Sequence, residues 1–145
     1  MVKAKPKVNF FFLNSNPFLK DRKRLKNFLL SIFNKESKSL ESINYVFADD
    51  RILLEINRKY LNHDFLTDII TFDLSEKNRP IIAEIYISIE RVKENAGIHK
   101  TTFKKELHRV IFHGALHLCG YNDKTTQQIA RMRKKEEFYI ARYFG

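Results

Sequence analysis

The sequence contains one cysteine and no tryptophan. A lone Cys119 cannot form an internal disulfide, which excludes the small disulfide-stapled secreted class and favours a reducing cytoplasm. No apolar run approaches the roughly 20 residues that a membrane-spanning helix needs. The short apolar patch behind the N-terminal lysines is not followed by a small-residue cleavage site, as a secretion signal would be. We therefore expect a cytoplasmic protein with no membrane partner.

Glycine and proline are also scarce, with four and three residues, and there is no repeat, low-complexity tract or glycine- and serine-rich linker. At 145 residues, of which 43% are hydrophobic, the chain fits one domain, residues 1–145, that buries roughly 70% of its unfolded surface.

The net charge of +10 is unevenly distributed, because residues 1–35 and 100–145 are basic whereas residues 36–99 are acidic. Such an excess of basic residues can simply keep the protein soluble, or it can form a surface that binds the phosphates of a nucleic acid. Charge alone does not distinguish these two interpretations.

Hydrophobic periodicity predicts a mixed α and β chain. Alternating or β-branched runs predict strands at 8–13, 42–48, 67–74 and 81–88, the first ending at a polar turn, residues 14–17. Helical spacing predicts helices from residue 18, from about 50, and at 89–96, 103–118 and 125–143, with Gly120 just past the fourth. This order favours an α+β fold (an α/β sandwich): a mixed four-stranded sheet packed by about five helices.

The segment from Phe112 to Asp123 is the most informative for chemistry. On a helix, His113 and His117 lie about 40° apart on neighbouring turns, so that two imidazoles can converge on one cation. Gly120 lets the chain fold back, and Asp123 is the first carboxylate after that turn. The pattern predicts a divalent metal bound by His113, His117 and Asp123 at the end of the long central helix. Two helical histidines satisfied by hydrogen bonds are the alternative.

A peptidase is disfavoured, because Gly114 stands where the HExxH motif of metalloproteases has its glutamate.

The same segment resembles the signature H-G-x-x-H-x-x-G-Y-D-H of the YbeY family of bacterial endoribonucleases. Two further blocks resemble that family in order and spacing. Residues 57–72 resemble its N-x-x-Y-R-x-x-D-x-x-T-D-V-L-S-F stretch, and residues 83–88 resemble its G-D-I-x-I-S strand.

The resemblance implies a metal-dependent hydrolase, commonly assigned one Zn²⁺ per chain, that cuts single-stranded RNA. It implies ribosomal RNA as substrate, in maturation of the 3′ end of the small-subunit RNA, and a part in ribosome quality control; DNA is not expected. Mn²⁺ or another divalent metal is an open alternative. A second open class is a non-catalytic RNA-binding ribosome-assembly factor whose metal is structural.

Three positions depart from the family pattern. Asp123 replaces the third histidine and can still bind zinc. Leu61 replaces an arginine, so that Arg58 or Lys59 would have to contact phosphate instead. Ala83-Glu84 replaces Gly-Asp.

The general base is not fixed by the sequence: Glu84 and Asp68 are candidates, or a metal-bound hydroxide attacks directly. The charges of Arg131, Arg133 and Lys134 on the last helix could follow RNA phosphates or be merely solvated. His63 could approach the site from its loop or be an ordinary loop residue.

Overall fold

The computed structural model describes residues 5–13 and 18–145. Within these residues the chain forms four strands, β1 (Lys7–Phe12), β2 (Leu40–Ala48), β3 (Ile69–Asp73) and β4 (Ile81–Ser88). The same residues form five helices, α1 (Arg22–Lys35), α2 (Asp50–Tyr60), α3 (Ile89–Ile98), α4 (Phe103–Leu118) and α5 (Thr126–Phe144). The predicted order of elements is confirmed. The predicted turn at 14–17 lies outside the described residues, and none of the described helices is long and apolar enough to cross a membrane.

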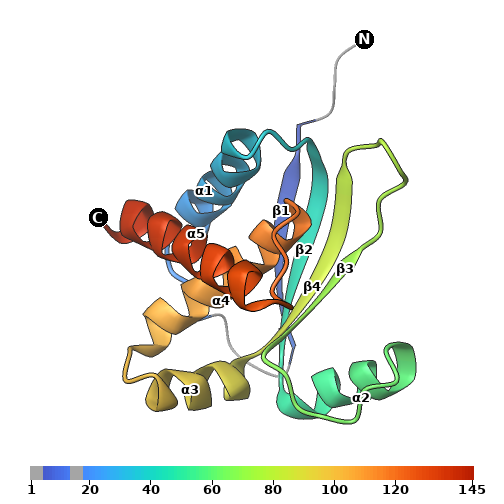
Figure 1. Cartoon of the computed structure of the whole chain (residues 1–145), viewed down its shortest axis with the longest axis vertical. Coiled ribbons are helices and arrows are strands. Elements are labelled where there is room, and N and C mark those ends of the chain that lie inside the picture. The colour runs from blue at the N-terminus through green and yellow to red at the C-terminus, as the bar shows by residue number, and fades with distance from the viewer. Residues whose placement is uncertain (1–4, 14–17) are drawn as a thin grey trace.

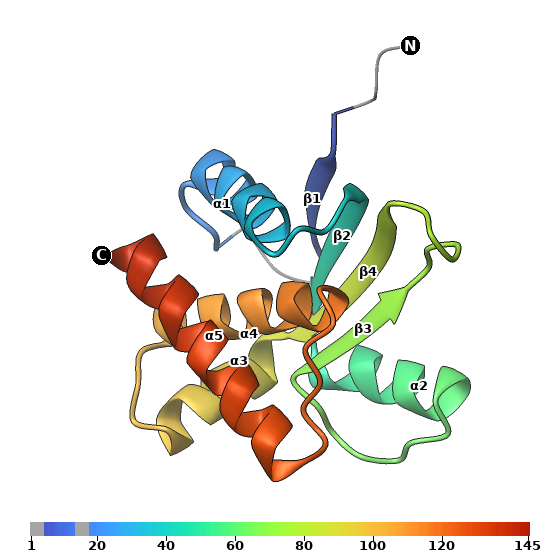
Figure 2. The same ribbon diagram turned by 45° about the horizontal axis from the view of Figure 1, so that its top comes forward.

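The strands form one mixed sheet in the order β1-β2-β4-β3. β1 and β4 each pair in parallel with β2, whereas β3 and β4 form the predicted antiparallel hairpin. Figures 1 and 2 show α1, α4 and α5 on one side of the sheet and α2 on the other. This arrangement is the predicted α+β sandwich.

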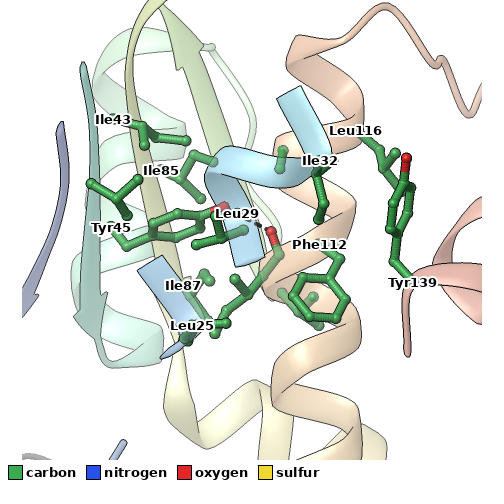
Figure 3. Close-up of a cluster of buried hydrophobic side chains, with 14 of the residues drawn as sticks. Leu25, Leu29, Ile32, Ile43, Tyr45, Ile85, Ile87, Phe112, Leu116 and Tyr139 are labelled. Carbon is green, nitrogen blue, oxygen red and sulfur yellow. Dashed lines mark hydrogen bonds between the residues drawn. The ribbon is translucent and has the colours of Figure 1, made fainter. Parts of the chain in front are cut away.

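The main core lies between the sheet and the helices α1 and α4 (Figure 3). Side chains of a strand point alternately to the two faces, and in β2 and β4 every second residue is a buried apolar one: Ile43, Tyr45, Phe47, Ala83, Ile85 and Ile87. The fully buried Tyr45 hydroxyl donates a hydrogen bond to the carbonyl oxygen of Ile111 on α4, at 2.8 Å. This bond ties the central strand to the helix that carries the two predicted metal-binding histidines.

α4 is positioned by its two ends and by one close contact. The Thr102 side chain caps its start by accepting from the amide of Lys105. Just beyond its end Gly120 has φ 103°, a left-handed conformation that favours glycine. Inside the helix, a Cβ added at Gly114 would lie 2.7 Å from Cδ1 of Ile85. A glycine at this position therefore lets α4 lie close against the sheet.

Candidate active site

A cleft of about 450 Å³ lies where α4 passes over β3 and the loop between α2 and β3. Its lining includes all three predicted metal ligands, together with Asp68 and Arg109. Residues that are far apart in the sequence meet here, because β3 pairs with β4 and α4 crosses that side of the sheet. The rest of the lining comes from α2, the α2–β3 loop, β3 and α4: Asn57, Leu61, His63, Phe65, Thr67, Ile69, Ile70, Thr71 and Val110.

His113 is oriented by a carboxylate from another helix. Its Nδ1 lies 2.5 Å from Oε2 of Glu136 on α5. A carboxylate oxygen accepts, so that Nδ1 carries the proton and Nε2 is the nitrogen free to meet a ligand. Burial by itself would lower the pKa of His113, but the hydrogen bond and the charge of Glu136 outweigh it and raise that pKa.

His117 is oriented in the same way by the turn that follows α4. Its Nδ1 lies 2.7 Å from the backbone oxygen of Tyr121. Since a carbonyl oxygen only accepts, Nδ1 again carries the proton and Nε2 is left for a ligand. The Tyr121 hydroxyl in turn donates to Glu36 at 2.7 Å, which fixes the turn to the end of α1.

Asp123 lies beside His113. Its Oδ2 is 3.3 Å from Nε2 of His113, and the rings of His113 and His117 have centroids 6.0 Å apart. Histidines that bind metal usually donate their other ring N–H to a carboxylate or carbonyl, and both do so here, so that the donor set fits a divalent metal. Among residues 5–13 and 18–145, however, no group of three or more histidine, cysteine, aspartate or glutamate side chains is already arranged to hold a metal ion.

Arg109 and two buried glutamates form a charged network beneath His113. The Arg109 guanidinium contacts Glu106 at 2.6 and 2.9 Å and Glu136 at 3.1 Å. Burial would raise the pKa of Glu136, but the hydrogen bond from His113 and the charge of Arg109 lower it, so that this carboxylate stays ionised. The sequence analysis missed these residues. Arg109 could have been found, because it precedes His113 by one helical turn, whereas Glu136 had no local signal.

Asp68, one of the two predicted candidate bases, lines the cleft. One of its carboxylate oxygens lies 3.4 Å from the side-chain amide of Asn95 on α3. Its backbone oxygen accepts from the amide of Ser88. Asp68 therefore lines the same cleft as the two histidines, with its carboxylate held by α3.

Glu84, the other candidate base, is not brought to the cleft. It alternates with Ala83 and Ile85, whose side chains face the main core, so that Glu84 points to the opposite face of the sheet. There it accepts a hydrogen bond from the Tyr86 hydroxyl and lines a separate pocket beside α2. The sequence-based assignment of Glu84 as a base is therefore not retained.

The five predicted RNA-binding cations also lie outside the lining of the cleft. Arg58 pairs with Asp64 in the α2–β3 loop, and Lys59 lies over the ring of Tyr60. The other three lie exposed on α5: Arg131, Arg133 and Lys134. They would reach RNA only outside the cleft.

Comparisons with known proteins show the family to which the chain belongs. The family described as "Endoribonuclease YbeY" matches residues 14–144. A protein of that name from Cytophaga hutchinsonii is 47% identical over 134 residues, which cover 92% of this chain and 94% of the relative. Another from Flavobacterium psychrophilum is 53% identical over 111 residues, which cover 77% and 79%.

A solved structure has the same fold. The solution structure of a protein from Thermotoga maritima superposes with a TM-score of 0.63 at 31% identity, covering 94% of this chain and 89% of that one. Sequence, fold and the three motif blocks agree, and the chain belongs to the YbeY family of endoribonucleases.

Proposed function

We propose that this protein is a metal-dependent endoribonuclease that cuts single-stranded RNA in the cleft between α4 and β3. Family membership makes it an endoribonuclease, a hydrolase of RNA phosphodiester bonds. The metal, which we propose to be Zn²⁺ or Mn²⁺, would be held by His113, His117 and Asp123. The observation that supports it best is that both imidazoles donate through Nδ1, leaving both Nε2 atoms for a ligand.

The chain's own residues would each have a defined part in hydrolysis. A bound divalent metal supplies a Lewis acid for the phosphoryl oxygen and acidifies a water. Glu136 and the Tyr121 carbonyl hold the two imidazoles in one tautomer and orientation. The Asp68 carboxylate would accept the proton of the attacking water, which is a proposal based on its place in the cleft lining.

The alternative, an RNA-binding scaffold with a structural metal, is disfavoured by the composition of the site. Structural zinc sites have four protein ligands and are closed, whereas catalytic sites keep a position open. The proposed ligands here are two imidazoles and one carboxylate, which would leave a position open, and the Asp123 side chain remains 41% exposed.

The remaining parts of the proposal, which concern the domain, the compartment and the substrate, are based on the family resemblance. We propose that residues 1–145 act as one domain in the cytoplasm. We further propose that the substrate is ribosomal RNA, in maturation of the small-subunit 3′ end and in quality control of ribosomes. The basic residues of α5 would then contact ribosomal RNA outside the cleft.

The test pairs metal analysis of the purified protein with cleavage of a single-stranded RNA. His117→Ala and Asp123→Ala should abolish cleavage and lower the bound metal, while circular dichroism shows an unchanged fold. The matched control is His99→Ala, which removes an exposed histidine outside the cleft. Folded variants that lose metal but cleave at the wild-type rate would refute the proposal.

A further inference from the structure

We propose that His63 and Phe65 form a stacking platform for an unpaired nucleobase of the RNA substrate. The two rings are stacked on each other, with centroids 4.9 Å apart and planes inclined by 22°. Both residues line the same cleft as His113 and His117, the proposed metal ligands. The inference rests on the proposed function, because it names how the substrate of that site is held.

The platform is open to solvent. Phe65 is 54% exposed, although burial of a phenylalanine side chain normally stabilises a protein. Leu61 and Leu66 on the same loop are exposed as well, at 38% and 47%. Exposed apolar surface beside a cleft is typical of a binding site, and here it would suit a flat, weakly polar ligand group.

The loop that carries the two rings is held in place. Asn57, a buried residue at the end of α2, donates from its side-chain amide to the backbone oxygen of Phe65 at 3.1 Å. Its own backbone oxygen accepts from the amide of His63 at 2.9 Å. Asp64, between the two rings in sequence, pairs with Arg58 of α2. These contacts hold the backbone of the loop that carries both rings against α2.

The chemistry of the platform suits a base rather than a phosphate. Proteins recognise single-stranded RNA by stacking its bases on aromatic side chains, and such stacking tolerates any sequence because every base has a π-face. Leu61 stands where the family pattern has arginine, so that this wall of the cleft offers apolar contact instead of charge. Arg58, a cation of α2 close to the two rings in sequence, is already paired with Asp64, so that it is not free to bind a phosphate there.

The chain has no tryptophan, so that Phe65→Trp introduces a single indole that reports directly on stacking. Oligoadenylate should quench the emission of this indole on binding, whereas an abasic ribose-phosphate oligomer of the same length should not. Phe11→Trp is the matched control, because Phe11 is 47% exposed on β1 and lies outside the cleft. Equal responses to the two oligomers, or binding measured by anisotropy without quenching, would overturn the platform.

Cleavage kinetics give a second readout. Phe65→Ala should raise KM for single-stranded RNA by about 5- to 150-fold, with kcat within about twofold, and Phe65→Tyr should restore the wild-type KM. An unchanged KM in a folded Phe65→Ala protein would also overturn the platform. If the wild type cleaves no RNA, the proposed function fails. Quenching in Phe65→Trp would still test, independently of cleavage, whether a base stacks on the platform.

Discussion

Glu136 on α5 accepts a hydrogen bond from His113 on α4 at 2.5 Å, and the same carboxylate is paired with Arg109. Its side chain is only 2% exposed. A buried carboxylate is tolerated when its partners satisfy it, and here those partners include a residue of the candidate metal site. The contact between the last two helices therefore fixes both the fold and the orientation of an imidazole.

Replacing Glu136 with glutamine tests this orientation. Glutamine has nearly the same shape but no charge, so that His113 loses the partner that raises its basicity. Removing such a partner typically lowers metal affinity 10- to 100-fold, and we expect a loss of that size in a competition titration with Zn²⁺. Glu137→Gln is the matched control, because Glu137 is exposed and lies outside the network. Equal affinities in the two variants would contradict this role.

Replacing Asp123 with histidine tests what the carboxylate does to the chemistry. Three neutral imidazoles leave more positive charge on a metal than two imidazoles and a carboxylate, and should acidify its water more. The rising limb of the pH–rate profile for RNA cleavage is therefore expected at lower pH in Asp123→His. Asn122→His places the new imidazole one residue away and should leave the profile unchanged. An identical profile for Asp123→His and wild type would contradict this effect of the carboxylate on the metal-bound water.

Local patterns in the sequence were sufficient to predict most of the fold and part of the site. The element order, the end of α4 before Gly120 and the meeting of His113 with Asp123 all depend on short-range rules of helix spacing and capping, and the structure agrees. Glu136 was missed because its contact with α4 is purely tertiary.

Glu84 was misassigned for a related reason. Period-two alternation in β4 shows that Glu84 and Ile85 face opposite sides, but it does not say which side α4 covers. That choice is made by the packing of the whole sheet, where the glycine at position 114 admits the helix against Ile85.

His108 should make stability depend on pH. It is 4% exposed, packed against Tyr143 and Phe112, and burial lowers its pKa, as do the charges of Lys104 and Arg24. The hydrogen bond with the Lys104 carbonyl opposes that shift without cancelling it. The unfolded chain therefore takes up a proton near pH 6.5 that the folded chain takes up only at lower pH.

The sign of the effect follows from this difference. The contribution of neutral His108 is fully present above about pH 6.5 and is lost as the pH falls through the lowered folded-state pKa. Urea unfolding at a series of pH values should show a smaller loss of the free energy of unfolding in His108→Phe than in wild type across that window. Parallel curves for the two proteins would show that His108 titrates alike in the folded and unfolded states.

Alanine substitutions at two helical glycines should have opposite effects. Gly97 in α3 has nothing within 4 Å of an added Cβ, so that Gly97→Ala should stabilise the protein by about 0.5–1 kcal/mol through helix propensity alone. Gly114→Ala brings the same gain, but its Cβ would lie 2.7 Å from Cδ1 of Ile85 and 3.0 Å from Cδ1 of Ile69. Overpacking a core typically costs about 1–3 kcal/mol, which exceeds the gain.

The crowding at position 114 should also displace residues of the active site. His113 is the adjacent residue, and α4 would move away from β3 and the cleft. We expect Gly114→Ala to lower both the free energy of unfolding in urea and the rate of RNA cleavage, while Gly97→Ala leaves the rate unchanged. Both close contacts are with flexible side-chain ends, so that the net loss should be small, but Gly114→Ala should still be less stable than Gly97→Ala. Equal stabilisation by the two substitutions would show that α4 does not need its close approach to the sheet.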